Sequence, residues 1–322
     1  MLWANENVSL PNNLPVAMKF YGKLQRKLKS NPELHGKIST IVQGYLQENP
    51  PHARKMSKQE VCTRTSKAWT LPTHPVTNPN KPGKIRLVNN AAAVYRGVSL
   101  NSSLVTGPDL LNRLVGVLMR FRCGEVAIAA DIESMFHQVR VRRDNADSLR
   151  FLWNDDITSN SPPDTYQMLV HIFGAKDSPT CANYALQRTA RDNQHNFDAL
   201  TYYSAIKAFY VDDLLKSIES TETAIRLAKQ LIEMLKCGGF RLCKFSSNRS
   251  EVLKALPASE VSPSATLQID AEEKMERALG TAWETTTDVF TFTTQIKEAP
   301  PSKRGVLATT SSLLDPMGFL VP

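Results

Sequence analysis

The sequence has no long apolar run, no secretory leader and no paired-cysteine motif. No apolar run approaches the roughly 18 residues that a transmembrane helix needs, so we expect no membrane-spanning segment. The first residues, MLWANENVSLPNN, lack a basic region and an apolar core, which predicts a protein that is not secreted. The odd number of cysteines, without a CxxC pair, indicates neither a zinc site nor a disulfide framework and favours free thiols inside the cell: Cys62, Cys123, Cys181, Cys237 and Cys243.

The length and the charge of the chain say more about its function than these missing features do. The chain has 322 residues, enough for two packed domains or one elaborate domain, and a net charge of +8. Residues 1–68 hold 11 Lys and Arg against 4 Asp and Glu, so 11 − 4 = +7 arises there, most densely in KLQRKLKS. Such a run is either a solvated helix face or the binding surface for a polyanion such as nucleic acid. Charge alone does not decide between these two interpretations.

Helical and strand patterns alternate irregularly along the chain. Apolar spacing predicts helices, several prolines between residues 71 and 82 exclude one, and short apolar runs predict strands. A loop at FGAKDSP turns into a helix, with Ser178 as the N-cap. The pattern, with several hairpins, favours an α+β fold over a doubly wound sheet. We predict helices over 14–29, 35–49, 107–122, 178–193, 220–237 and from 301, strands over 84–88, 125–132 and 240–245, and hairpins around 208–218 and 277–296.

The stretch AFYVDDLLKSI places two adjacent carboxylates, Asp212 and Asp213, between large apolar residues. Neighbouring carboxylates disfavour each other and disfavour burial. The pair could simply cap a surface hairpin, since Asp is a good turn residue. The turn carries no Gly, Asn or Pro, however, and a site that keeps two carboxylates together at neutral pH usually supplies a divalent cation.

A third carboxylate, Asp131, ends the apolar strand EVAIAADI, 81 residues before Asp212. Taken singly, Asp131 could be a helix N-cap, since DIESMF could begin a helix. Together, a strand-end Asp and a hairpin Asp-Asp are what a two-metal phosphoryl-transfer site needs. Carboxylates from separate strands there hold two Mg²⁺ ions about 4 Å apart.

The order of these motifs resembles the polymerase core of reverse transcriptases. Asp131, at the end of a predicted strand, is followed along the chain by the loop FGAKDSP, which precedes a helix. The stretch FYVDD comes next, and a further helix and the stretch GGFRLCKF follow it. The wider text resembles the polymerase region of BEL/Pao-type LTR retrotransposons (the Pao family), notably LPTHPVTNPNKPGKIRLV, ADIESMFHQVRV, YQMLVHIFGAKDSPTCANYAL and RGVLATTSSLLDPMGFLVP. The resemblance covers nearly the whole chain.

The resemblance implies a residue-by-residue site. Asp131, Asp212 and Asp213 match the catalytic metal-binding triad, with the Ile132 carbonyl as a further ligand and two Mg²⁺ ions, or Mn²⁺ in their place, as cofactors. The residues that match the dNTP-binding set are Lys84, Arg86, Phe136, Phe173, Gly174 and Lys244. Phe136 matches the bulky ring that excludes a 2′-hydroxyl. Without the resemblance, Lys84 and Arg86 would be taken for an exposed strand face, Phe136 for core, and Lys244 for an exposed strand end.

Tyr210, Leu279 and Gly280 match primer-binding positions, the last two within RALG, which could also be a plain β-turn. The sequence departs from the family it resembles at Asn89 and Asn90, where that family usually has an aromatic residue followed by an acid. This departure puts a fingers contact in doubt, and with it triphosphate binding, but it removes no metal ligand.

These matches imply a right-hand polymerase fold with fingers, palm and only the start of a thumb. The expected divisions are 1–68, a basic helical lead; 69–255, fingers and palm; 256–274, a linker; and 275–322, a primer-grip-like hairpin and the start of thumb or connection. No protease, integrase or RNase H motif is recognisable, so we expect a fragment of a longer polyprotein, or a decayed or mis-bounded copy of one.

The implied function is RNA-directed DNA polymerisation (reverse transcriptase, a nucleotidyltransferase). The expected partners are an RNA or DNA template with its primer, dNTPs and other products of the retrotransposon polyprotein, in the cytoplasm or in virus-like particles. A non-catalytic, nucleic-acid-binding remnant is the alternative. A structural subunit without a nucleic-acid role fits the triad and the charge poorly.

Overall fold

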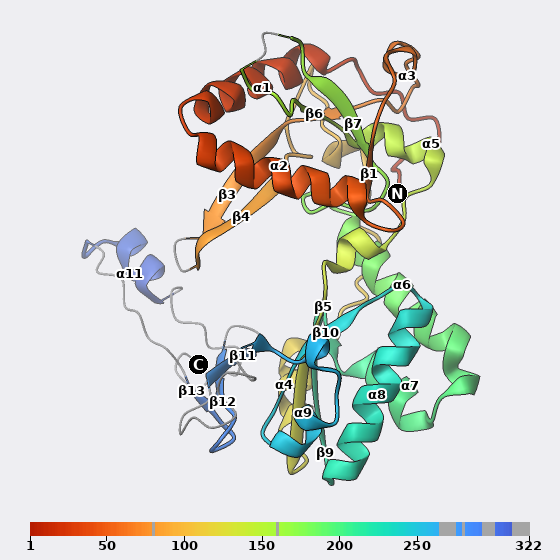
Figure 1. The fold of residues 1–322 in the computed structure, drawn as a ribbon, viewed down its shortest axis with the longest axis vertical. Coiled ribbons are helices and arrows are strands. Elements are labelled where there is room, and N and C mark those ends of the chain that lie inside the picture. The colour runs from red at the N-terminus through yellow and green to blue at the C-terminus, as the bar shows by residue number, and fades with distance from the viewer. Residues whose placement is uncertain (79–80, 159–160, 264–274, 279–280, 292–299, 311–322) are drawn as a thin grey trace. The chain divides into compact units, whose positions relative to one another are not determined.

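The computed structural model describes residues 1–78, 81–158, 161–263, 275–278, 281–291 and 300–310 (Figure 1). The chain divides into two compact units. Unit 1 comprises 1–109 and 136–182, and unit 2 comprises 110–135 and 183–322. Mixed helix and sheet in both units agree with the predicted α+β class. Among the described residues, no helix combines the length and the apolar character that crossing a membrane requires.

Unit 1 consists of helices around short strands. Its elements are α1 (Leu14–Lys29), α2 (Pro32–Gln47), β1 (Ala53–Lys55), α3 (Lys58–Cys62), β2 (Thr70–Leu71), β3 (Thr73–Asn78), β4 (Lys81–Asn89), η1 (Asn101–Ser103), α5 (Arg143–Ala146), η3 (Asp147–Leu149), β6 (Arg150–Trp153) and β7 (Asp164–Met168). The 3₁₀ turn η2 (Met135–Gln138) and helix α6 (Ser178–Asn193) contain residues of both units.

The core of unit 1 includes part of the predicted basic lead. A four-stranded sheet has the order β1-β7-β6-β2, and β3 pairs with β4 in a separate hairpin. Leu24 and Leu28 of α1 and Ile38 of α2 are buried in the same cluster as Trp69 and Phe151. The lysines and arginines of α1 lie between these apolar positions and are mostly exposed. The helix therefore has one face in the core and one basic face toward solvent.

Unit 2 is built on an antiparallel sheet of order β10-β5-β9-β8. Figure 1 labels β10, β5 and β9 of this sheet. The elements of unit 2 are α4 (Leu114–Phe121), β5 (Val126–Ile132), η4 (Gln194–Asn196), α7 (Ala199–Lys207), β8 (Phe209–Tyr210), β9 (Asp213–Ile218), α8 (Thr221–Cys237), β10 (Leu242–Ser247), α9 (Ser250–Lys254), η5 (Ala258–Glu260), β11 (Met275–Ala278), β12 (Thr281–Glu284), β13 (Val289–Thr291) and α11 (Lys303–Thr310).

Helix α8 follows its sequence pattern closely. The Ser220 side chain caps the helix by accepting a hydrogen bond from the Thr223 N–H. Leu227, Leu231 and Leu235 form a buried stripe along the helix predicted over 220–237, which ends at Cys237 with Gly238 as its C-cap. The helix packs against β5, β9 and β10 and so supports the strands that carry the aspartates.

Helix α4 covers a face of the same sheet. Val117, Leu118 and Phe121 pack with Ala127 of β5 and Leu215 of β9. Trp283 of β12 belongs to this cluster, and its ring meets Phe121 edge-on with the centroids 4.9 Å apart. The predicted hairpin after residue 277 is therefore a three-stranded sheet, β11-β12-β13, attached to α4.

Several predicted boundaries differ from the structure, and hydrogen bonds account for two of these differences. The helix predicted over 107–122 begins only at Leu114, because the Asn112 amide donates to the Ile206 and Phe209 carbonyls and fixes the preceding chain outside the helix. The N-cap of α6 is Asp177 and not Ser178, since the Cys181 N–H donates to the Asp177 carbonyl. The Ser178 hydroxyl instead donates to the Ile172 carbonyl.

Candidate active site

Two of the three predicted aspartates are direct neighbours across unit 2's sheet. Strand β5 pairs antiparallel with β9, and Asp131 lies opposite Asp213 in this register. Directly opposed residues have Cβ atoms about 4.5–5.5 Å apart. The Ile132 N–H donates to the Asp212 carbonyl at 2.8 Å, which ties the end of β5 to the turn that carries the second aspartate. The fold thus brings Asp131 to the Asp-Asp pair from 81 residues away.

The face on which the carboxylates lie follows from strand periodicity. Pairs alternate between the two faces of a sheet, so Asp131 and Asp213 share a face with Ala129 and Leu215, two residues along. That face packs under α4 through Leu215. The carboxylates therefore stand at the end of an apolar face, which accounts for the partial burial of Asp213.

The turn between β8 and β9 is strained. Tyr210 pairs with Asp213, so Val211 and Asp212 form a two-residue turn, and Val211 has φ = 56°. A positive φ is favoured for glycine and unusual for a β-branched residue. Backbone strain of this kind clusters at functional sites, where surrounding structure enforces it.

A lysine on the neighbouring strand completes the charge cluster. The pairing of β10 with β5 shifts register between Cys243 and Ser246, and Lys244 within this irregularity has φ = 56°. A bulge of this kind redirects a side chain. The Lys244 Nζ makes an ion pair with Asp131 Oδ1 at 2.8 Å. Burial is the largest single influence on Lys244 and opposes its charge. The hydrogen bond and the charge of Asp131, together with nearby Cys243 and Glu133, outweigh burial and raise the pKa of the ammonium.

Burial and the neighbouring carboxylates together change the protonation of Asp213. Burial, followed by the charges of Asp212 and Asp131, raises the pKa of Asp213 to about 7, although Lys244 acts in the opposite direction. Without a metal ion, Asp213 therefore keeps its proton below about pH 7. A divalent cation would replace that proton, and carboxylate oxygens are the ligands that Mg²⁺ prefers. The donor set fits the predicted cofactor.

Two predicted nucleotide-binding residues of unit 1 are in ring contact. The half-buried Phe136 ring, in η2, lies against the 48% exposed Phe173 ring, with centroids 4.7 Å apart. Gly174 has φ = 107°, and a Cβ there would overlap the Asn89 carbonyl oxygen. Only glycine fits this approach, so the loop depends on the strand that carries the departure at Asn89.

For the remaining predicted residues the structure gives only a strand position or the burial of the side chain, or does not describe the residue. Tyr210 is half-buried against the α4 cluster. Arg86 is exposed on β4, opposite Val76. Lys84 lies on the same strand, but its side chain is outside the described residues. Leu279 and Gly280 are outside the described residues altogether.

The structure adds a residue that the sequence pattern did not single out. The Asn101 amide donates to the Gly174 carbonyl at 2.9 Å, and its Oδ1 accepts from the Lys176 N–H at 3.0 Å. The side chain thus holds the Phe173–Gly174 loop from a site 73 residues earlier. No local signal marks it, because NSS reads as an ordinary turn.

The search for CxxC pairs did not reveal a cluster of three residues in unit 1 whose types can bind a metal ion. Ligand atoms of His171, Asp177 and Cys181 in unit 1 lie within 4.8 Å of one another. Burial lowers the pKa of His171 to about 4 and raises the pKa of Cys181 to about 11, so both are neutral at pH 7 without a metal ion. The five cysteines are all free, as predicted. The group has no CxxC signature because its members come from a loop and the first turn of α6.

Comparison with known proteins supports the predicted type of fold. No protein-family model matches the chain, and no curated protein matches it. Solved structures of foamy viral protease-reverse transcriptase do match. The complex with dsDNA has a TM-score of 0.54 and 14% identity over 85% of this chain and 46% of that one. The complex with RNA/DNA hybrid has a TM-score of 0.51 and 13% identity over 80% of this chain and 26% of that one. The chain thus has a reverse transcriptase-like fold and spans less than half the length of these proteins.

Proposed function

We propose that the chain is the polymerase core of an RNA-directed DNA polymerase, from a retrotransposon of the BEL/Pao type. The observation that carries the proposal is the pairing of Asp131 with Asp213 across β5 and β9, beside the strained turn that holds Asp212. In this proposal the unit 2 sheet is the palm, the β3–β4 hairpin belongs to the fingers, and the β11–β13 sheet is the primer-grip region.

The reaction is attack of a primer 3′-oxygen on the α-phosphate of a dNTP, with release of pyrophosphate. Bound Mg²⁺ would lower the pKa of the attacking hydroxyl and neutralise charge on the leaving group. The aspartates would supply the negative charge that holds the ions, and Asp213 would give up its proton on metal binding. Lys244 offers a cation at the same edge of the sheet, where negative charge develops on the leaving phosphates.

Nucleic-acid binding belongs to the same proposal. The foamy viral neighbours were solved with RNA/DNA hybrid and with dsDNA. The exposed basic face of α1 is available for phosphates, and Arg86, Phe136, Phe173 and Gly174 keep their predicted roles toward the incoming dNTP. Discrimination against ribonucleotides would be steric, since an aromatic ring offers a 2′-hydroxyl no hydrogen-bond acceptor.

Primer extension tests the proposal. The purified chain, a DNA primer on an RNA template, dNTPs and Mg²⁺ should give extended primer. Asp131→Asn and Asp212→Asn should each abolish extension, because a neutral amide of nearly the same volume is a poor ligand for Mg²⁺. Asp192→Asn is the matched control, since Asp192 is exposed on α6 and pairs with Arg188 four residues away on the same helix.

The outcomes separate the two candidate functions. Extension by the wild type and by Asp192→Asn, with loss in the other two variants, supports the polymerase. Duplex binding without extension by any of the four proteins would favour the non-catalytic remnant.

A further inference from the structure

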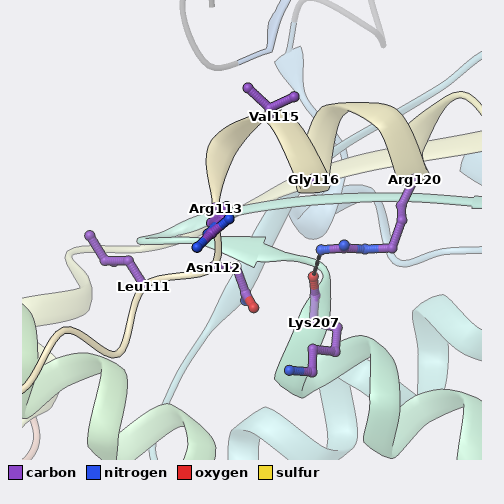
Figure 2. A pocket seen from close by; sticks show the side chains of 7 residues that line it. All are labelled: Leu111, Asn112, Arg113, Val115, Gly116, Arg120 and Lys207. Atoms are coloured by element: carbon purple, nitrogen blue, oxygen red, sulfur yellow. Dashed lines mark hydrogen bonds between the residues drawn. The ribbon is translucent and has the colours of Figure 1, made fainter.

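A basic cavity of about 600 Å³ lies in unit 2 at the start of α4 (Figure 2). Three cationic side chains line it: Arg113 and Arg120 from α4 and the chain before it, and Lys207 from the end of α7. All three are exposed to solvent. No acidic residue is among the described residues that line the cavity, so its formal charge is +3.

Arg120 is oriented by two features of the backbone. Its Nη2 donates to the Lys207 carbonyl at 2.8 Å, and Figure 2 shows the guanidinium reaching across the cavity to that oxygen. A Cβ at Gly116, one turn earlier in α4, would lie only 3.2 Å from Arg120 Nη1. Glycine at this position leaves room for the guanidinium to lie along the helix. One N–H donor of the Arg120 guanidinium bonds to the Lys207 carbonyl, and other N–H donors of the guanidinium can bind a ligand.

The cavity is fixed to the hairpin that carries Asp212 and Asp213. The Asn112 amide donates to the Ile206 and Phe209 carbonyls, each at 2.9 Å. Phe209 starts β8, which leads directly into the Val211–Asp212 turn. A group bound between Arg113 and Lys207 would therefore be held by the same short stretch of chain that positions the carboxylates.

The lining chemistry selects a phosphate and not a nucleobase. Arginine forks match phosphate oxygens in geometry and charge. The apolar part of the lining is Leu111 and Val115, and no aromatic ring is present among the lining residues on which a base could stack. The volume exceeds that of a single phosphate and suits a short stretch of sugar–phosphate backbone. Contacts of this kind position a strand without reading its sequence.

We propose that this cavity binds backbone phosphates of the template or primer strand, which rests on the proposed function of unit 2 in nucleotide polymerisation. Each cation that pairs with a strand phosphate releases counterions, so it adds about 0.9 to the slope of log affinity against log salt. The cavity is predicted to account for up to three such contacts.

The experiment is fluorescence anisotropy of a labelled RNA–DNA primer–template duplex with the full chain, over a series of KCl concentrations. The double variant Arg113→Gln and Lys207→Gln should lower the salt slope by about 1.8 and weaken binding by about tenfold or more at 0.1 M salt. The charge-conserving pair Arg113→Lys and Lys207→Arg should keep the wild-type slope. The matched control removes two exposed lysines of α8, Lys229→Gln and Lys236→Gln, and should also leave the slope unchanged.

The proposal is wrong if the cavity variant keeps the wild-type salt slope. It is also wrong if the α8 control lowers the slope by the same amount, because the lower slope would then reflect the net charge of the protein alone. A second arm adds inorganic tripolyphosphate. If tripolyphosphate raises the melting temperature of the wild type but not of the cavity variant, while the duplex slope is unaffected, the cavity binds free polyphosphate and the strand proposal fails. Primer extension by the wild type reports separately on the polymerase function, since anisotropy needs no synthesis.

Discussion

Replacing Asp213 by asparagine should stabilise the metal-free protein at alkaline pH. The Asp213 pKa is raised from 3.8 to about 7, so the folded chain holds a proton that the unfolded chain has lost between about pH 4 and pH 7. Stability therefore falls as pH rises through that window and stays low above it. A shift of about three pKa units corresponds to about 4 kcal/mol, and partial solvent exposure of Asp213 reduces this to about 2–4 kcal/mol.

The measurement is thermal or urea unfolding in a chelator-containing buffer, from pH 5 to pH 8.5. At pH 8.5 Asp213→Asn should unfold at a temperature several degrees above the wild type, because the amide carries no charge to desolvate. At pH 5 the difference should nearly vanish, since the wild-type carboxyl is then protonated. Added Mg²⁺ should stabilise the wild type and have a smaller effect on the variant.

Asp192→Asn controls for the loss of one carboxylate elsewhere. This exposed residue pairs with Arg188 on the same helix, so its loss should cost less than about 1 kcal/mol at every pH in the range. The reasoning is refuted if Asp213→Asn is destabilising at pH 8.5 without metal, or if its effect is the same at pH 5 as at pH 8.5. Either result would mean that the carboxylates are too far apart, or too well solvated, to disturb one another.

Three further predictions concern activity and binding. Asp212→Asn should lose nearly all primer extension while its circular dichroism spectrum and unfolding midpoint at pH 7 stay close to those of the wild type. Phe136→Val should raise ribonucleotide kcat/KM relative to deoxyribonucleotide kcat/KM by about tenfold or more on one template; an unchanged ratio would make the ring a packing residue only. Neutralising Lys23, Arg26 and Lys27 on the exposed face of α1 to glutamine should lower the salt slope of duplex binding by up to about 2.7, and an unaltered slope would mean that this face meets only water.

The parts of the fold that could be predicted from sequence are those set by local patterns. The apolar stripe of α8 and the two glycines after it predicted the helix within a residue or two, because burial and helix termination act within one element. The Asp-Asp pair stood out because carboxylates between large apolar residues are costly without a cation. Strand ends could be predicted for Asp131 and Asp213, but their direct opposition depends on the register of β5 with β9, which neither strand specifies alone.

Features that depend on long-range contacts could not be read from the chain. The first half of the predicted helix over 107–122 is lost to hydrogen bonds from Asn112 to carbonyls more than 90 residues away. Asn101 holds the Gly174 loop over a similar separation. The bulge at Lys244 leaves no mark in FRLCKF, which reads as a regular strand, yet it brings the ammonium to Asp131.

Backbone strain helps to decide between the two interpretations of the Asp-Asp turn. A hairpin that served stability alone would have Gly or Asn at the first central position, where φ is positive. Val211 is there instead, and it is the one β-branched residue among the non-glycine positions with positive φ in the described chain. The left-handed conformation costs an L-residue about 1–2 kcal/mol. A solvated surface turn has no reason to keep this strain. A turn that must hold Asp212 beside Asp131 and Asp213 does, because the pairing of β9 with β8 on one side and with β5 on the other enforces the conformation and keeps Asp212 next to the paired Asp131 and Asp213.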